Sequence, residues 1–280
     1  MMIITSEINP APALAPYVRC YAYREFDTGS ANMLKPWHAS HEISLIFFFK
    51  ALPVQLTDPK TGEILKKGSY CDIVGIGTQY NGEMFFNGCY AFFEIAFKAG
   101  GFNKIFNICG SEFINQIVCG EDILDAEIKI LYERLCSTES TEEMAALSNK
   151  FLLTYLNRQQ PGDSKDIIMK ASNIIIKNEG NANINKLANL ANMSIRNFER
   201  HFIRQTGTPP KLLCSITRFN HAFSLKLANP QESWASIAAS AGYFDQMHLI
   251  REFKRFSGNA PSVFLKETPL TEEHFINRVH

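Results

Sequence analysis

The sequence lacks the cysteine pattern of a disulfide framework or of a cysteine-based zinc site. Its seven cysteines are an odd number, and no two of them form a CxxC pair. We therefore expect the cysteines to be small buried hydrophobic side chains. No cofactor and no metal ion are expected.

Long apolar runs and a secretory start are also missing. The strongly apolar stretch 43–49 is far shorter than the roughly 20 residues of a membrane helix. The first seven residues contain no basic segment followed by an apolar one. A soluble cytoplasmic protein is expected, and 280 residues with 46% hydrophobic content favour two globular domains.

Net charge is zero, but the two halves of the chain differ. Residues 1–164 carry 13 Lys and Arg against 19 Asp and Glu, a net charge of −6. Residues 165–280 carry 15 against 9, a net charge of +6. This asymmetry indicates that the second half contacts a polyanion.

The basic half contains an internal repeat between residues 187 and 264. Leu187 and Ala188 align with Ile237 and Ala238 at an offset of 50 residues. The second copy has one extra residue in its turn, after which the offset is 51 for Phe198/Leu249, Arg200/Arg251, Phe202/Phe253, Arg204/Arg255, Gly207/Gly258 and Pro210/Pro261. Such a repeat indicates two copies of one structural unit.

Each copy has the pattern of a short helix, a tight turn and a longer helix. Ser194 is a good N-cap for a helix that ends near Thr206, before Gly207. Asp245 has the same role for a helix that runs to about Ser257. The sequence therefore predicts two helix-turn-helix units with recognition helices at 194–206 and 245–257.

The face of each longer helix that is opposite its apolar side is basic and carries amide groups. This combination suits the DNA major groove, because Arg pairs with guanine, amides pair with adenine, and Lys adds charge toward phosphates. Base contacts are expected from Arg196, Asn197, Arg200, Gln246, His248 and Arg251. Phosphate contacts are expected from Ser194, Arg204, Lys186, Lys211, Lys254 and Arg255.

A spacer helix is predicted between the two units, over residues 210–228. At about 1.5 Å per residue it is about 28 Å long, slightly less than the ~34 Å of one DNA turn. The recognition helices would then enter successive major grooves of a somewhat bent duplex. Another helix, from Asp163 or Ser164 to Gly180, is expected to pack on the first unit.

Residues 165–267 resemble the DNA-binding domain of the AraC-type transcription regulators. The resemblance lies in MSIRNFERHFIRQTGTPP (193–210), TRFNHAFSLKLA (217–228) and SIAASAGYFDQMHLIREFKRFSGNAPSVF (236–264). It departs from the family pattern at Tyr243, where Phe is usual, and at Leu249. It implies base contacts at Arg196, Glu199, Arg200, Met247, His248, Ile250 and Arg251. Among these, Met247 and Ile250 rank low because they offer at most a contact to a thymine methyl group.

The first 125 residues have the pattern of β structure. Short runs rich in Ile, Phe and Tyr at 17–26, 43–50 and 90–97 are separated by turn signals, which favours a small barrel or curved sheet. Helical periodicity follows at 122–135 and 141–157, and a linker at 159–162. The resemblance implies a cupin-like sensing and dimerising domain here. If a dimer forms, we expect it to use Met144, Leu147, Phe151 and Tyr155, although packing on the same chain is equally plausible.

Three sets of residues in this half are candidates for a site. WHASHE, with His38, His41 and Glu42, contains only part of a metal ligand set, so polar turn or strand residues are favoured. The segment 75–80 starts like a dinucleotide fingerprint but lacks its third glycine, which favours a strand and turn. An aromatic group would line an effector pocket or, with more weight, fill a core: Tyr21, Tyr23, Phe26, Trp37, Tyr80, Phe85 and Phe86.

The sequence thus predicts a two-domain α+β protein that regulates transcription and has no catalytic residues. A β-rich domain at 1–160 precedes a DNA-binding domain at 163–268 and a tail at 269–280. Double-stranded DNA is the expected partner. A homodimer, an effector of unknown identity and, for an activator, RNA polymerase are further partners. The alternatives are a DNA-repair or DNA-modifying enzyme with the same reader, and a metabolite-binding cupin with a helical interaction module.

Overall fold

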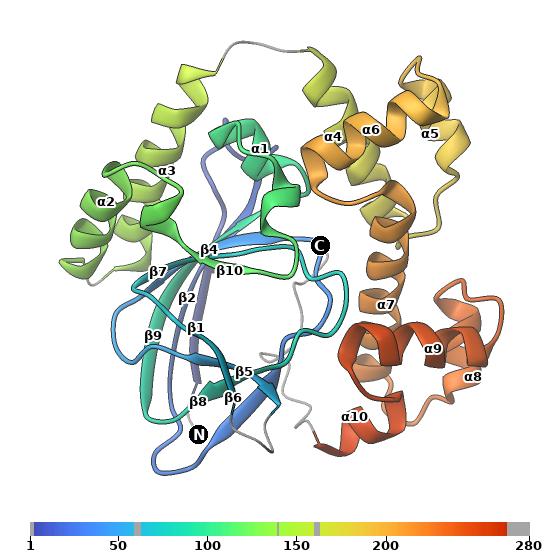
Figure 1. The fold of residues 1–280 in the computed structure, drawn as a ribbon, viewed down its shortest axis with the longest axis horizontal. Helices are drawn as coiled ribbons and strands as arrows, with labels where there is room; N and C mark the ends of the chain where they lie inside the picture. Colours follow the sequence, from blue (N-terminus) through green and yellow to red (C-terminus); the bar gives the residue numbers. More distant parts are fainter. Residues whose placement is uncertain (1–2, 59–62, 139, 160–162, 268–280) are drawn as a thin grey trace.

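The protein is described here by a computed structural model that covers residues 3–58, 63–138, 140–159 and 163–267. The described residues up to 159 form the β half, and residues 163–267 form the helical half. Figure 1 shows the helical half along one side of the β half. The α+β architecture expected from the sequence is therefore confirmed.

Two antiparallel sheets make up the β half. The six-stranded sheet has the order β1-β2-β9-β4-β7-β10, and the four-stranded sheet has the order β3-β8-β5-β6. The strands are β1 (Ile3–Ile8), β2 (Val18–Asp27), β3 (Met33–Pro36), β4 (Ile43–Phe48), β5 (Val54–Asp58), β6 (Glu63–Lys67), β7 (Cys71–Val74), β8 (Glu83–Phe86), β9 (Cys89–Phe97) and β10 (Ile117–Cys119).

The six-stranded sheet has two chemically different faces, because successive side chains of a strand point to opposite sides. In β4, Leu45 and Phe47 belong to a large hydrophobic core, whereas Ser44, Ile46 and Phe48 line a cavity. In β9, Phe93 and Ile95 join the same core, and Phe92 and Glu94 line the cavity. The sheet therefore separates a packed interior from a hollow one.

Three helices and two 3-10 turns cover the core face of this sheet: α1 (Gly101–Phe106), α2 (Glu127–Cys136), α3 (Thr141–Arg158), η1 (Gly110–Phe113) and η2 (Gly120–Asp122). Helix α2 begins five residues later than the periodicity predicted, because a 3-10 turn occupies 120–122. In the described residues, no helix is long and apolar enough to cross a membrane.

The apolar side of α3 packs inside its own chain. Met144, Phe151 and Tyr155 are buried in the core of the β half, and Leu147 packs against it. Asn149 on the same helix accepts a hydrogen bond of 2.8 Å from the Tyr21 hydroxyl. The expectation that these side chains form a dimer surface is therefore wrong. Packing on the same chain is the arrangement observed.

The helical half contains α4 (Asp163–Lys177), α5 (Ile184–Leu190), α6 (Ile195–Thr206), α7 (Pro210–Ala228), α8 (Trp234–Ser240), α9 (Gln246–Ser257) and α10 (Pro261–Glu267). The two predicted helix-turn-helix units are α5-α6 and α8-α9, and the predicted spacer is α7. Leu213 and Cys214 of α7 pack in the core of the first unit, whereas Phe219 and Phe223 pack in that of the second. One continuous helix therefore belongs to both units.

The carboxyl ends of both recognition helices contact the β half. In α9, the Phe256 carbonyl accepts a hydrogen bond of 2.8 Å from the Ala39 amide, and the Arg255 carbonyl accepts one of 3.0 Å from the Tyr80 amide. At the end of α6, the Arg204 carbonyl lies 2.9 Å from the thiol of Cys109. These carbonyls belong to the last helical turns, where intrahelical donors run out.

Backbone contact at the end of α6 leaves no room for a side chain. Gly207 ends this helix with φ +83°, and a Cβ placed there would lie 2.7 Å from the Gly110 carbonyl carbon. We expect Gly207→Ala to destabilise the protein by clearly more than the roughly 1–2 kcal/mol of a left-handed alanine. Gly29→Ala is the matched control, because Gly29 has φ +60° and nothing within 4 Å of the built Cβ. Chemical denaturation measures both, and equal losses of stability would show that the Gly110 contact is unimportant.

Candidate functional site

The first recognition helix, α6, presents a row of arginines to solvent. Ser194 caps this helix, and its hydroxyl accepts a hydrogen bond of 3.3 Å from the Asn197 amide. Phe198 and Phe202 are fully buried on the inner face. On the outer face, the exposed Arg196, Arg200 and Arg204 follow one another at intervals of four residues. Because four residues are close to one turn, the three side chains lie on one line.

The second recognition helix, α9, has the same construction with a different outer face. Asp245 caps it and accepts a hydrogen bond of 2.6 Å from the His248 amide. Leu249 and Phe253 are buried. At the positions of the three arginines of α6, this helix carries Met247, Arg251 and Arg255, all exposed.

The predicted base-reading residues differ in their exposure to solvent. Arg196, Arg200, Gln246 and Arg251 are exposed, whereas Asn197, Glu199 and His248 are partly buried. Asn197 accepts a hydrogen bond of 2.8 Å from the Arg200 guanidinium, which orients that side chain along the helix. The His248 ring packs edge-on against Tyr243, with ring centroids 5.2 Å apart, so it lies at the border of the outer face.

The predicted phosphate-contacting residues all lie on the surface of the helical half. Lys186 is on α5, Lys211 lies in the first turn of α7, and Arg204, Lys254 and Arg255 occupy the last turns of the recognition helices. All are exposed, as is Ser194. The Arg255 guanidinium lies 5.2 Å from the centre of the Phe256 ring.

From the sequence, one exposed apolar residue of this surface, Met247, ranked low as a base contact, and another, Phe244, was not identified. Met247 has the helix position of Arg196 and is 59% exposed. Phe244, in the turn before α9, is 93% exposed. The extra residue that the repeat alignment found in this turn was the available signal for Phe244.

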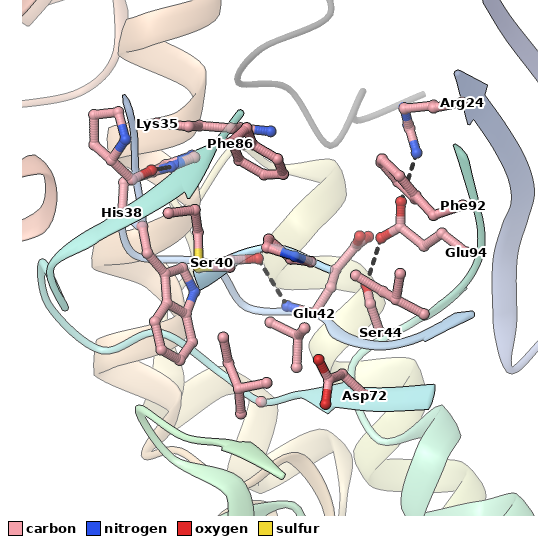
Figure 2. Close-up of a pocket in the computed structure, with 18 of the residues that line it drawn as sticks. Arg24, Lys35, His38, Ser40, Glu42, Ser44, Asp72, Phe86, Phe92 and Glu94 are labelled. Atoms are coloured by element: carbon pink, nitrogen blue, oxygen red, sulfur yellow. Dashed lines mark hydrogen bonds and ion pairs between the residues drawn. The ribbon is translucent and has the colours of Figure 1, made fainter. Parts of the chain in front are cut away.

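The two sheets of the β half enclose a cavity of about 220 Å³. Its apolar wall includes Trp37, Ile46, Met84, Phe86 and Phe92, and its polar wall includes Arg24, Lys35, Glu42, Ser44 and Glu94. Figure 2 shows this polar group, in which Glu94 lies between Arg24 and Ser44. Asn220 of α7 completes the lining, so the cavity extends to the helical half.

The cavity carboxylates have partners of their own. Glu94 accepts hydrogen bonds of 2.6 Å from both Arg24 and Ser44. Burial opposes the ionisation of Glu94, but Arg24 and Ser44 outweigh it and hold the pKa below its usual value. Glu42 pairs with Arg19 at 2.8 Å, although burial raises the pKa of Glu42.

Lys35 is the cavity cation to which none of these carboxylates binds. Among the described residues, no hydrogen bond or ion pair to its ammonium group is found. Burial, together with the nearby Arg24 charge, lowers the pKa of Lys35 to about 8. A half-buried ammonium group that lines a cavity and forms no ion pair can bind an anion that enters the cavity.

The candidate site residues from the sequence lie in different parts of the structure. Trp37 and Phe86 line the cavity, whereas Tyr21 is buried in the core behind the six-stranded sheet. Among the described residues, no three His, Cys, Asp or Glu side chains are arranged to hold a metal ion. Burial raises the pKa of Cys20 to about 12, which disfavours a reactive thiolate at this cysteine.

Comparison with known protein families places two matches on this chain. A helix-turn-helix domain family matches residues 187–267, which contain both units and the spacer. The matched span contains both copies of the repeat. Residues 187–267 therefore form a helix-turn-helix domain of this family. A second match, to a domain of unknown function (DUF6597), covers residues 6–119 of the β half.

Two curated relatives share part of this chain. The Msm operon regulatory protein of Streptococcus mutans serotype c is 26% identical over 158 residues, 56% of each chain. An uncharacterized HTH-type transcriptional regulator of Haemophilus influenzae is 35% identical over 88 residues, 31% of this chain and 29% of that protein. The chain thus spans between about a third and somewhat over half of these relatives.

Solved structures of ToxT from Vibrio cholerae are also similar. The structure from strain O395 has 11% identity and a TM-score of 0.48, and the match covers 88% of this chain and 97% of ToxT. A structure of ToxT with bound unsaturated fatty acid, from strain SCE256, has 12% identity and a TM-score of 0.48, with 90% and 96% covered.

Stability should depend on His41, which lines a small void between the β half and α6. Burial, then the Arg19 charge, lowers its pKa to about 4, and its Nδ1 is buried without a hydrogen-bond partner. His41 therefore binds a proton near pH 6.5 in the unfolded chain but only near pH 4 in the folded protein. Stability should fall as the pH drops from about 6.5 to 4, by up to about 3 kcal/mol.

Denaturation at several pH values measures this slope. His41→Gln should flatten it, whereas His201→Gln on α6 should leave it in place. An unchanged slope in His41→Gln would mean that other groups cause the acid sensitivity.

Proposed function

We propose that this protein is a sequence-specific DNA-binding transcription regulator that reads two successive major grooves with α6 and α9. The observation that carries the proposal is the pair of capped helices with exposed cationic faces on one continuous spacer. A face of this kind is suited to phosphates and base edges, and a spacer of about 28 Å is close to one helical turn of DNA.

The orientation of the recognition helices supports this mode of binding. Their carboxyl ends contact the β half, and the amino end of each lies one helix length from this contact along the helix axis. For 12 residues this is about 18 Å. Residues near the amino end of a recognition helix make the base contacts in helix-turn-helix proteins. Arg196, Arg200, Met247 and Arg251 lie in this part.

The two helices should read different base pairs. Arg200→Ala and Arg251→Ala are each expected to weaken specific binding by about 1–3 kcal/mol, because each removes a base contact. The lost preferences should lie about 10 base pairs apart. Sites selected from a random duplex library by the full-length protein, followed by titration of single-base variants, give this measurement.

Two controls accompany the experiment. Lys150→Ala changes an exposed lysine of α3 in the β half and should leave binding unchanged. The affinity of the unmodified protein should fall steeply as salt rises, because phosphate contacts release counterions. Loss of preference at the same base pairs in both arginine variants would contradict the two-groove mode.

For the β half, we propose a small organic anion as effector. Support comes from the apolar cavity wall together with the ammonium group of Lys35, which forms no ion pair with Glu42 or Glu94. Such a pocket binds an amphiphile by apolar contact and one charge-assisted hydrogen bond.

The same cavity is connected to the reading helices through one segment. Trp37, His38, Ala39 and Ser40 line it, and the amide of Ala39 donates to the end of α9. A ligand that displaces this segment therefore acts on the position of α9. We propose that the effector changes the relative placement of α6 and α9 and leaves their DNA-contacting side chains untouched.

Lys35→Met tests the effector proposal. Monocarboxylic acids with aliphatic or aromatic bodies should raise the melting temperature, and their neutral amides should not. Lys35→Met should lose at least about tenfold in affinity, because a hydrogen bond between charged groups is removed. Lys67→Met, on an exposed strand position, should bind normally.

Binding should also take up protons near pH 8, because a bound carboxylate raises the lowered pKa of Lys35. Calorimetry in buffers of different ionisation enthalpy detects this uptake. Equal stabilisation by acids and amides would contradict the role of Lys35.

A further inference from the structure

The two recognition helices occupy equivalent places in the repeat but differ in chemistry. Arg196 begins the outer row of α6, and Met247 occupies the same position in α9. One turn further along, both helices carry an arginine, Arg200 in the first and Arg251 in the second. Within the outer row of three residues, the difference therefore lies in the amino-terminal turn, the part of a recognition helix that contacts base edges.

A second exposed apolar residue, Phe244, precedes Met247 by three positions in the chain. Four residues separate α5 from α6, whereas five separate α8 from α9. The turns match up to Met193 and Tyr243, whose amides donate to the carbonyls of Ala188 and Ala238 at 3.0 and 2.9 Å. The extra residue is Phe244, which the first unit lacks.

Phe244 is held outward by its neighbours. Tyr243 fills the interior side of the turn, where it is buried and lies 5.4 Å from the Arg218 guanidinium. Asp245 is fixed on the other side as the cap of α9. Between these two anchors the Phe244 side chain is 93% exposed, more than any other large hydrophobic residue in the described chain.

We infer that α9 recognises thymine through Met247 and Phe244, whereas α6 recognises guanine through Arg196 and Arg200. The thymine C5-methyl is the apolar group on the major-groove edge of a base pair, and Arg pairs with guanine O6 and N7. Lys254 and Arg255 lie on the same outer face of α9. Their positive charges suit the phosphates that flank such a base contact. This inference rests on the proposed DNA-binding function and adds the base preference of each helix.

A protein partner is the alternative ligand for the apolar tip, the surface formed by Phe244 and Met247. The surrounding charges favour DNA, because Arg251, Lys254 and Arg255 are all cationic and exposed, and the carboxylate on this helix, Glu252, is partly buried. Glu252 faces the spacer, where it lies 3.8 Å from Arg218. Asp245, also exposed, serves as the cap of α9, and the other exposed charges of this helix are positive.

The test uses the full-length protein and duplexes selected by it from a random library. Each thymine of the selected site is replaced in turn by deoxyuridine, which removes only the methyl group. At one or two thymines in the α9 half of the site, this change should weaken binding by about three- to tenfold. The double variant Met247→Ala, Phe244→Ala should bind the thymine and uracil duplexes equally.

Two further variants sharpen the result. Met247→Arg should exchange the thymine preference for guanine at the same base pair, because it gives α9 the residue of α6. Leu190→Ala is the matched control, since Leu190 is 74% exposed but lies on α5. Circular dichroism confirms that each variant is folded, as expected for changes on the surface.

The outcomes are distinct. If the double variant selects the same motif, or keeps the full uracil penalty, thymine recognition by these residues is wrong. Unchanged DNA binding with loss of promoter output would also overturn it and assign the tip to a protein partner. If the unmodified protein enriches no motif, the proposed function itself fails.

Discussion

Hydrogen bonding at the ends of two helices is the constraint on which the rest of this structure depends. A helix leaves its last carbonyls without donors, and here amides of the β half supply them for α9, while a thiol lies against the last turn of α6. The two helices thereby contact the β half through their carboxyl ends, while the outer faces of their capped amino-terminal turns remain exposed. Because α7 packs in both helical cores, the two units and the β half form one connected framework.

Local chemistry allowed much of the helical half to be predicted from the sequence. The caps Ser194 and Asp245 and the terminating Gly207 and Gly258 mark the helix boundaries, and the structure has the helices within those limits. The spacer 210–228 also agrees. These signals act over three or four residues, so a single sequence reveals them.

Contacts between segments that are distant in the chain could not be predicted from the sequence. Lys35, Ser44 and Glu94 come from three strands and meet in one cavity only because β4 and β9 pair and β3 belongs to the facing sheet. The bond between Ala39 and Phe256 joins residues more than two hundred positions apart. Likewise, the apolar side of α3 gave no indication of whether it packs within the chain or against a second copy. Hydrophobic periodicity shows which face is buried and does not identify what buries it.

The turn before α9 is one residue longer than the turn before α6, and this difference affects the direction in which the chain lies along DNA. Two identical recognition helices would read two identical half-sites, and exchanging these half-sites would leave the site unchanged. Helices that differ in their amino-terminal turns read different half-sites in a fixed order, so a single chain bound in the proposed way has a defined upstream and downstream end. Polarity of this kind arises within one subunit, without a symmetric partner and without a palindromic site.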